Sequence, residues 1–380
     1  MPPTDRTPAV TDTSRVVTRY RVTGADPREV AEAIRVEQTI EFPLDLAPAW
    51  IREDVVGRID RVEGDEVEIS YDAAVVGAEP AQVLNVVWGN VSLFENVRLV
   101  GLHLPEPVLR LFPGPRFGVP GVRALVEAPH RPLLATALKP MGTSAADLAR
   151  LAGLLAENGF DLVKDDQGLT DQVWAPWDER VARCAEAVHA ANGRTGRTTL
   201  YLPSLNVPGP LLLERAHRAK ELGAGGFLVV PGIVGFDGLR ALAADPGLGL
   251  PIMAHPSGIG SAVVNPAQGW RHGLLLGYLN RLQGADACIF PHAGGRFTFS
   301  PQACADIAAE CRRPLPGIAP ALPSPGGGIT LDRVDEVLAT YGRDVLLLVG
   351  GAVHRGDVAA NTRTLRTAAE RWAPVATGGA

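Results

Sequence analysis

The chain contains very little lysine. Of its 36 basic residues only Lys139, Lys164 and Lys220 are lysines, so nearly all of the positive charge is carried by arginine. A lysine amine can lose its proton when it is buried, whereas a guanidinium cannot, so the few lysines are candidates for work that needs an amine. Lys139 and Lys164 end apolar runs and are treated as candidate functional residues. Lys220 belongs to a polar helical stretch and is expected to be solvated.

Cysteine pairs, long apolar runs and excess positive charge are also missing. The four cysteines form no CxxC pair, which is typical of reduced thiols in the cytoplasm. No apolar run reaches the roughly 18 residues of a membrane span, and no signal peptide opens the sequence. The formal net charge of −6 argues against broad nucleic-acid binding. We therefore expect a cytoplasmic protein that binds neither nucleic acid nor membranes.

The first third of the chain predicts a small α+β domain. Residues 1–15 are expected to be a disordered tail because they are rich in Pro, Thr and Asp. Residues 16–125 form the predicted N-terminal domain, which is ferredoxin-like with an antiparallel sheet. Within it we expect a strand at 16–22, a helix at 27–35, a strand at 36–41 and two strands at 57–71 around Glu63-Gly64-Asp65.

Residues 126–380 predict a (β/α)8 TIM barrel. Apolar strands alternate with helical stretches eight times over about 245 residues, as such barrels require. The predicted strands are 133–139, 162–166, 198–203, 226–231, 251–255, 287–292, 317–323 and 345–350, and one of the predicted helices covers 268–283. An open doubly wound sheet is the alternative fold. The number of repeats and the residues at the strand ends favour the barrel.

Reactive side chains stand at the ends of four predicted strands: Lys139, the segment 164–166, His255 and His292. Active sites of TIM barrels lie at the C-terminal ends of the strands. A strand sends alternate side chains to the same face, so Lys164 and Asp166 point together while Asp165 points away. The pair is either a structural ion pair or a metal site in which the lysine amine has captured CO2 as a carbamate. Mg²⁺ prefers such oxygen ligands.

Glycine-rich segments follow the last two predicted strands. Gly326-Gly327-Gly328 lies after the seventh strand, and Gly350-Gly351 ends the eighth. These are the frequent phosphate-binding positions of TIM barrels, where backbone N–H groups act as donors. Plain flexible turns are the alternative. Arg296, just after His292, is a candidate anion-binding residue, although most arginines simply lie on the surface.

Several of these segments together resemble the large-subunit family of RuBisCO, and in particular the RuBisCO-like proteins that do not fix carbon. The similar segments are Trp88-Gly89-Asn90-Val91, Leu138-Lys139-Pro140, Phe160-Asp161-Leu162-Val163-Lys164-Asp165-Asp166, Gly326-Gly327-Gly328-Ile329 and Gly350-Gly351. The resemblance extends from about residue 16 to residue 372. The segment that ends the second barrel strand is the most specific of the five.

The resemblance implies a homodimer with shared active sites and a phosphorylated small-molecule substrate. It implies Mg²⁺ held by carbamylated Lys164 with Asp166 and Gln167. It assigns Lys139 to acid/base chemistry or enolate stabilisation. The other implied site residues are His255 and His292 beside the substrate, and Asn90 and Glu37 from the partner subunit. The shared chemistry would be removal of a proton beside a ketone, with the metal stabilising the enediolate oxygens.

The chain also departs from the family pattern. Gln167 replaces a glutamate metal ligand, Met141 replaces the second lysine of the first strand motif, and Pro256 replaces an arginine. The segment His292-Ala293-Gly294-Gly295-Arg296-Phe297 lacks the lysine that carboxylases need, so we do not expect CO2 fixation. We expect an isomerase or a decarboxylating lyase whose substrate is a phosphorylated keto-sugar or keto-sugar acid. The alternatives are a methionine-salvage enolase or isomerase of methylthio-ketose phosphates, and a non-catalytic sugar-phosphate binder.

Overall fold

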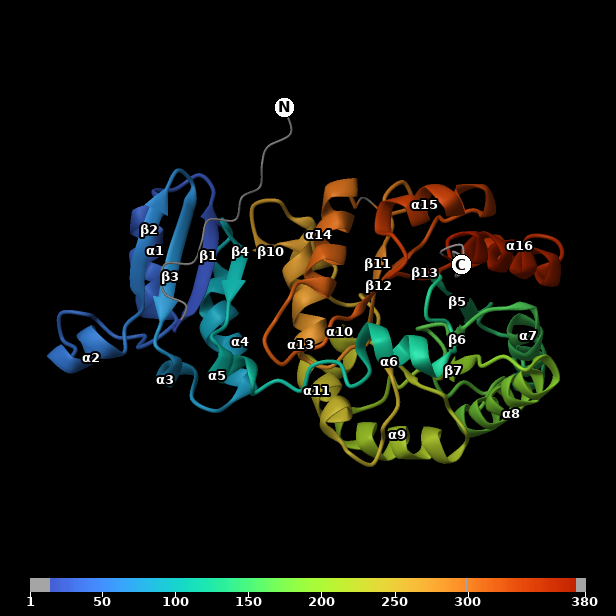
Figure 1. The fold of residues 1–380 in the computed structure, drawn as a ribbon. Coiled ribbons are helices and arrows are strands. Elements are labelled where there is room, and N and C mark those ends of the chain that lie inside the picture. The colour runs from blue at the N-terminus through green and yellow to red at the C-terminus, as the bar shows by residue number, and fades with distance from the viewer. Residues whose placement is uncertain (1–13, 298, 374–380) are drawn as a thin grey trace, which may run out of the picture. The chain divides into compact units, whose positions relative to one another are not determined.

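The computed structural model describes residues 14–297 and 299–373, so most of the predicted N-terminal tail lies outside the described residues. The chain divides into two compact units (Figure 1). Among the described residues, the first unit contains residues 14–112 and 260–274, and the second contains residues 113–259, 275–297 and 299–373. Arg15 already belongs to the folded part of the first unit, because it is buried and its Nε donates to Ser70 Oγ at 3.0 Å.

The first unit is built on a five-stranded sheet. In sheet order its strands are β10 (Gly269–Trp270), β4 (Val97–His103), β1 (Val16–Val22), β3 (Glu66–Tyr71) and β2 (Arg58–Glu63). All neighbours are antiparallel except β10 and β4. The predicted strand at 16–22 and the predicted pair of strands around Glu63-Gly64-Asp65 are confirmed. The helices of this unit are α1 (Pro27–Glu37), α2 (Ala49–Asp54), α3 (Ala73–Val76), α4 (Pro80–Trp88), η1 (Asn90–Leu93), α5 (Glu106–Leu109) and α12 (Ser261–Val264).

Two elements that were predicted from the sequence differ in the structure, so these predictions are wrong. The strand expected at 36–41 is absent from the structure, because α1 continues to Glu37 and the chain then turns. The helix expected at 268–283 instead begins as β10, which pairs with β4 through Gly269 opposite Arg98 and Trp270 opposite Leu99. A π-helix, η3 (Gly273–Leu279), and the short helix α13 (Asn280–Leu282) follow. An apolar run of this kind does not by itself distinguish a strand from a helix.

The second unit is the predicted barrel. In sheet order its eight parallel strands are β7 (Leu200–Leu202), β6 (Leu162–Asp165), β5 (Leu133–Leu138), β13 (Leu346–Leu348), β12 (Leu322–Gly326), β11 (Ala287–Pro291), β9 (Ile252–Ala254) and β8 (Phe227–Val229). A bridge between Ser204 and Leu228 joins the two ends of this order. The TIM barrel is therefore confirmed, and the open doubly wound sheet is not the fold.

One barrel strand lies later in the sequence than predicted. The seventh strand was expected at 317–323, but β12 covers Leu322–Gly326 and thus includes part of the predicted glycine loop. Pro323 and Pro325 have no N–H group to donate to a neighbouring strand. Accordingly, β12 pairs with β11 along its whole length but with β13 only at Gly326.

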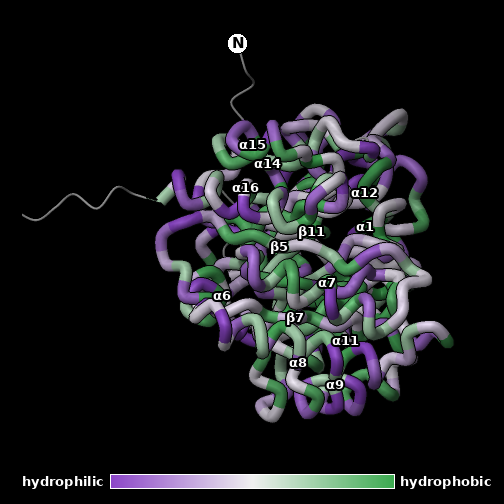
Figure 2. Tube along the Cα trace, turned by 90° about the vertical axis from the view of Figure 1, so that its right-hand side faces the viewer, coloured by the Kyte–Doolittle hydropathy of each residue, from purple (hydrophilic) through white to green (hydrophobic). Residues whose placement is uncertain are grey.

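Helices follow the barrel strands as the alternating pattern predicts (Figure 1). They are α7 (Ala145–Asn158), α8 (Trp177–Thr195), η2 (Gly209–Leu211), α9 (Leu212–Glu221), α10 (Pro231–Val234), α11 (Phe236–Ala244), α13, α14 (Pro301–Arg312), η4 (Leu331–Arg333), α15 (Val334–Tyr341), η5 (Gly351–His354) and α16 (Val358–Arg371), while α6 (Gly118–Leu125) precedes β5. Figure 2 shows hydrophobic residues along inner strands such as β7 and hydrophilic stretches on outer helices such as α9. Within the described residues, no helix is long and apolar enough to cross a membrane.

The inward faces of the barrel strands determine which side chains point along the barrel axis toward its C-terminal end. A buried apolar cluster contains Leu133, Ala135, Leu162, Leu202, Leu228, Met253, Ala287, Ile289, Leu322, Leu346 and Leu348, together with side chains of α6. Alternate residues of a strand share one face. Lys164 follows Leu162 by two positions and His255 follows Met253 by two, so both continue the inward face of their strands toward the C-terminal end of the barrel.

Candidate active site

The end of β6 presents one lysine inward and one carboxylate outward. Lys164 is only 1% exposed, and its Nζ donates to the backbone carbonyl of Asp165 at 3.0 Å. The Asp165 side chain points the other way and accepts from Tyr201 Oη at 2.8 Å and from the Ser204 N–H at 3.1 Å. It also forms a fully buried ion pair with Arg180 at 3.2 Å. These contacts anchor the end of the strand from behind, so that Lys164 and Asp166 face the barrel axis.

Lys139 and Asp166 come together at the ends of adjacent strands. Lys139 directly follows β5, and its Nζ lies 2.7 Å from Asp166 Oδ1. Burial lowers the pKa of Lys164 from its ordinary value to about 8, while the negative charge of Asp166 opposes that shift and the positive charge of Lys139 adds to it. A lysine with this pKa has a substantial uncharged fraction in mildly alkaline solution, and the uncharged amine is the form that reacts with electrophiles.

The side chains of Lys164, Asp166 and Gln167 fit an oxygen-preferring cation only in part. Asp166 offers a carboxylate and Gln167 an amide oxygen, and both are partly exposed. Within the part of the chain that the structure describes, no group of three His, Cys, Asp or Glu residues could hold a metal ion. An unmodified amine is a poor ligand for Mg²⁺. The set therefore fits Mg²⁺ when Lys164 carries a carbamate, which supplies the missing anionic oxygen.

His255 lies near the two lysines and is held as a neutral imidazole. Its Nδ1 accepts from the Ser257 N–H at 3.2 Å, which leaves the proton of the neutral ring on Nε2. Burial lowers the pKa of His255 to about 3, and the positive charges of Lys164 and Lys139 contribute to this shift. His255 can thus donate a hydrogen bond at neutral pH but carries no charge.

His292 lies in a different set of contacts. It follows β11 and is 6% exposed, and its Nδ1 is 3.0 Å from the Tyr341 hydroxyl on α15. Its backbone N–H donates to the carbonyl of Gly326 at 2.8 Å, which ties it to the end of β12. The pKa of His292 is lowered by burial and then by the positive charge of Arg333.

The loop after β11 packs directly on the glycine corner, which is the segment Gly326-Gly327-Gly328 at the end of β12. A Cβ atom at Gly295 would lie 2.4 Å from the Gly327 carbonyl oxygen, and one at Gly328 would lie 2.5 Å from the Gly295 Cα. Gly327 and Gly328 both have left-handed φ angles, +80° and +82°. Only glycine allows both this backbone conformation and this approach, so the two loops depend on each other's composition.

The remaining candidates in the second unit are more open. Arg296 is exposed, and its guanidinium lies 5.1 Å from the centre of the Phe297 ring. No atom of the described residues lies within 4 Å of a Cβ position at Gly350 or Gly351, so space lies beside both. A further residue after β13, His354 at the end of η5, was not among the candidates and has a buried Nε2 with no hydrogen-bond partner among the described residues.

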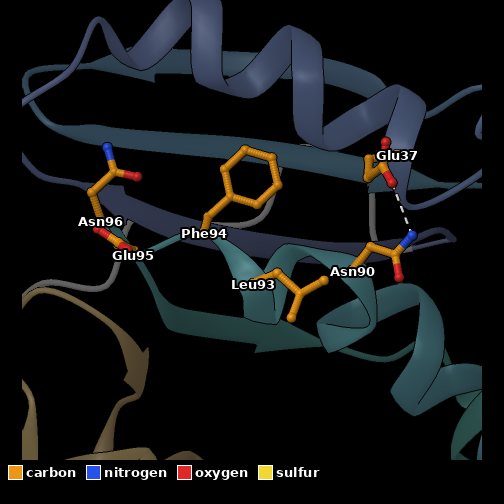
Figure 3. Close-up of a pocket in the computed structure, with 6 residues that line it drawn as sticks. All are labelled: Glu37, Asn90, Leu93, Phe94, Glu95 and Asn96. Atoms are coloured by element: carbon orange, nitrogen blue, oxygen red, sulfur yellow. Dashed lines mark hydrogen bonds between the residues drawn. The ribbon is translucent and has the colours of Figure 1, made fainter.

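Glu37 and Asn90 lie together in the first unit. Asn90 Nδ2 donates to Glu37 Oε1 at 2.8 Å, at one end of a pocket that Leu93, Phe94, Glu95 and Asn96 complete (Figure 3). The buried side chain of Gln38 fixes this corner, because it donates to the carbonyls of Asn85 and Val86 and accepts from the Val91 N–H at 2.7 Å. The contact between Glu37 and Asn90 joins two segments far apart in the sequence.

Sequence reasoning missed two residues of the second unit, Tyr341 and Arg333. Tyr341 is buried at the end of α15, and its ring contacts those of Phe290 and His292. Arg333 ends η4 and is near His292. Neither belongs to a recognisable motif. Their position after the glycine corner was the only signal that could have pointed to them.

Comparison with known proteins identifies what this arrangement is similar to. The profile of the family described as ribulose bisphosphate carboxylase large chain, catalytic domain, matches residues 118–297. The chain is 38% identical to ribulose bisphosphate carboxylase-like protein 1 of Rhodopseudomonas palustris, over 96% of this chain and 98% of that one. It is also 38% identical to a 5-methylthioribulose-1-phosphate isomerase of Rhodospirillum rubrum, over 90% and 91%. The crystal structure of a rubisco-like protein from Alicyclobacillus acidocaldarius, 34% identical, superposes with a TM-score of 0.86 over 95% of both chains.

Proposed function

The chain belongs to the ribulose bisphosphate carboxylase large-chain family as a RuBisCO-like protein, and on this premise we propose that it is an enzyme that forms an enediolate from a phosphorylated ketose. The observation that carries the proposal is the group at the ends of β5 and β6. A buried lysine of lowered pKa, Lys164, lies beside an ion pair between Lys139 and Asp166. Perturbed lysines of this kind are typical of sites that work through an amine.

In this proposal Lys164, Asp166 and Gln167 hold Mg²⁺. The uncharged amine of Lys164 would attack CO2, forming an N–C bond while one C–O π bond breaks and its electrons go to oxygen. The nitrogen then loses one proton to solvent, and the resulting carbamate provides an anionic oxygen. The bound Mg²⁺ would supply positive charge that lowers the energy of the enediolate oxygens. Gln167 gives the site one negative charge fewer than a glutamate would, so we expect weak metal binding.

The other residues bind substrate and move its proton. Lys139, held by Asp166, is placed to exchange a proton with the carbon beside the ketone. His255, neutral with its proton on Nε2, donates a hydrogen bond to a substrate oxygen. The glycine corner at 326–328 and the pair Gly350-Gly351 take the phosphate through backbone N–H groups. His292 lines the substrate near this corner. We propose that Asn90 and Glu37 complete the site of the partner subunit in a homodimer.

The first substrate to test is a methylthio-ketose phosphate. The 38% identical relative from Rhodospirillum rubrum is named for 5-methylthioribulose 1-phosphate, which has a single phosphate. Met141, which replaces a lysine of the family pattern, is half exposed and contributes an apolar side chain after Lys139. Both observations favour an isomerase of this substrate class over a decarboxylase of a keto-sugar acid phosphate.

Proton exchange tests the proposal. The protein is incubated in D2O with Mg²⁺, bicarbonate and 5-methylthioribulose 1-phosphate, and the substrate C–H signals are followed by NMR. We expect exchange or isomerisation in the wild type and none with Lys164→Ala. Lys220→Ala is the matched control, because Lys220 is exposed and only donates to the Gly247 carbonyl at 2.6 Å.

Two further results separate the alternatives. Loss of CO2 from a keto-sugar acid phosphate, without exchange in the methylthio substrate, would support the decarboxylase instead. Binding of both substrates without exchange or bond cleavage, unchanged by Lys164→Ala, would support the non-catalytic sugar-phosphate binder and contradict the enzyme.

A further inference from the structure

The guanidinium of Arg333 is held in a fixed orientation through two of its three nitrogens, and the third, Nη1, is its free end. It forms a two-pronged ion pair with Glu336 one turn later, with Nε to Oε2 at 3.0 Å and Nη2 to Oε1 at 3.0 Å. Its Nη1 makes no hydrogen bond within the described part of the chain. A bidentate pair fixes the plane of a guanidinium, so the direction of Nη1 is set as well.

The free end of Arg333 lies over the loop that packs on the glycine corner. A Cβ atom at Gly294 would be 3.4 Å from Nη1 of Arg333. The next residue, Gly295, is in direct contact with Gly327 and Gly328. Arg333 is therefore within about one residue's length of the corner whose backbone N–H groups are proposed to bind phosphate.

A phosphate dianion at the glycine corner would be bound more tightly if a cation lay beside it. The arginine that the family pattern has after His255 is Pro256 here, and the loop after β11 contains no lysine. Arg296, the candidate from the sequence, is exposed and lies beside Phe297. Arg333 is close enough to His292 for its charge to affect that ring. Its side chain is 33% exposed, so the group is accessible to a ligand but partly shielded from solvent.

We propose that Arg333 binds the phosphate dianion of the substrate through Nη1, with Glu336 as a positioning residue that orients the guanidinium. The ligand class is an organic monophosphate. The inference rests on the proposed function in that the phosphate belongs to the reacting substrate, but the binding itself requires no turnover. A purely structural role, in which the pair of Arg333 and Glu336 only holds the start of α15, is the competing explanation.

Binding of inorganic phosphate measures the contribution of Arg333 directly. Calorimetric titration is performed on the wild type, Arg333→Gln, Glu336→Gln and Arg343→Gln. We expect Arg333→Gln to weaken phosphate binding about tenfold, as expected for the loss of a charge-assisted hydrogen bond to a dianion. Glu336→Gln keeps the guanidinium and one side-chain oxygen that can still accept from it, so the orientation is only partly lost and phosphate binding should weaken about threefold, less than with Arg333→Gln. Arg343, exposed before β13 at the other end of the barrel, is the control and should show no change.

A second arm uses 5-methylthioribulose 1-phosphate and separates this inference from the proposed function. If the enzyme turns the substrate over, Arg333→Gln should raise KM about tenfold with little change in kcat. Weaker phosphate binding without any turnover in the wild type would overturn the proposed function and leave Arg333 as an anion ligand. Wild-type protein that does not bind millimolar phosphate, equal weakening by Arg333→Gln and Glu336→Gln, or turnover with an unchanged KM in Arg333→Gln would each overturn the role of Arg333.

Discussion

The Lys139 ammonium lies 2.7 Å from a carboxylate oxygen of Asp166, so the main carboxylate of the proposed metal site already has a cationic partner. The Lys139 side chain is 34% exposed and that of Asp166 is 16% exposed, which leaves the pair open to competition from a bound cation. A metal ion and this ammonium must share the same carboxylate, and like charges at short range repel. If Asp166 is a metal ligand as proposed, Lys139 should lower the affinity of the site for Mg²⁺.

Replacing Lys139 by methionine should separate these two effects. We expect Lys139→Met to bind Mg²⁺ about tenfold more tightly in the presence of bicarbonate, because the competing charge is removed. The same variant should lose proton exchange, because no amine remains beside the reacting carbon. Mg²⁺ titrations followed by thermal shift and the NMR exchange assay measure the two properties. Unchanged metal affinity would show that Asp166 is not a metal ligand.

Gln167→Glu should strengthen the metal site without removing a reacting group. The substitution adds a negative charge next to Asp166, so we expect about a tenfold lower Mg²⁺ requirement for proton exchange. Gln172→Glu is the matched control, because Gln172 lies in the same loop but its amide already bonds to the Gly168 carbonyl at 2.8 Å. An identical Mg²⁺ dependence in wild type and Gln167→Glu would place the cation elsewhere.

Lys164 should destabilise the fold at neutral pH. Its pKa is about 8 in the folded protein against an ordinary value of 10.5, so the unfolded chain binds more protons between these values. The free energy of unfolding therefore rises with pH across this window, and the penalty at pH 7 is about 3 kcal/mol for the full shift. Lys164→Met lacks this penalty and should be more stable at pH 7 in CO2-free buffer, by roughly 1–3 kcal/mol.

Urea denaturation at several pH values checks this prediction. The stability difference between Lys164→Met and the wild type should shrink as the pH is raised from 8 to 10, whereas Lys220→Met should show no such trend. A variant that is less stable than the wild type at pH 7 would mean that the ammonium's contacts with Asp165 and Asp166 outweigh its burial.

Mixing two inactive variants tests the proposed sharing of active sites. Lys164→Ala and Asn90→Ala are each expected to be inactive. After unfolding and joint refolding, random dimers should regain about a quarter of the wild-type activity, because each mixed dimer has one intact site out of two. Absence of any recovery, with mixed dimers confirmed by mass spectrometry, would show that each site is built from a single chain.

The sequence predicts the barrel well because its signals are local and repeated. Each strand of the barrel is buried on both faces and reads as a short apolar run, and the lysine at the end of β6 follows from the two-residue period of a strand. The contact between Lys139 and Asp166 was foreseeable for the same reason, since their strands were expected to be neighbours. Among the barrel strands only the bounds differ from the prediction, most of all at β12, whose two prolines are typical of a loop.

The missed features depend on contacts that no local pattern contains. The hydrogen bond between the His292 imidazole and the Tyr341 hydroxyl is one such contact, because Tyr341 lies 49 residues later in the chain. Arg333 is one of many arginines and becomes distinct only through its distance from Gly294. The helix predicted at 268–283 begins as a strand because an edge of the first unit's sheet was available to pair with Gly269-Trp270, and tertiary context overrides propensity in such segments.

The short strand β10 has a consequence for how this protein is made. Residues 260–274 belong to the first unit although five barrel strands precede them in the chain. The first unit's sheet therefore cannot be completed on the ribosome until about residue 270 has emerged, and until then the edge of β4 is unpaired. An unpaired edge strand is a site of wrong association. A gene fragment that stops after residue 125 would encode a permanently incomplete sheet, so this N-terminal unit is poorly suited to being expressed or exchanged as a separate module.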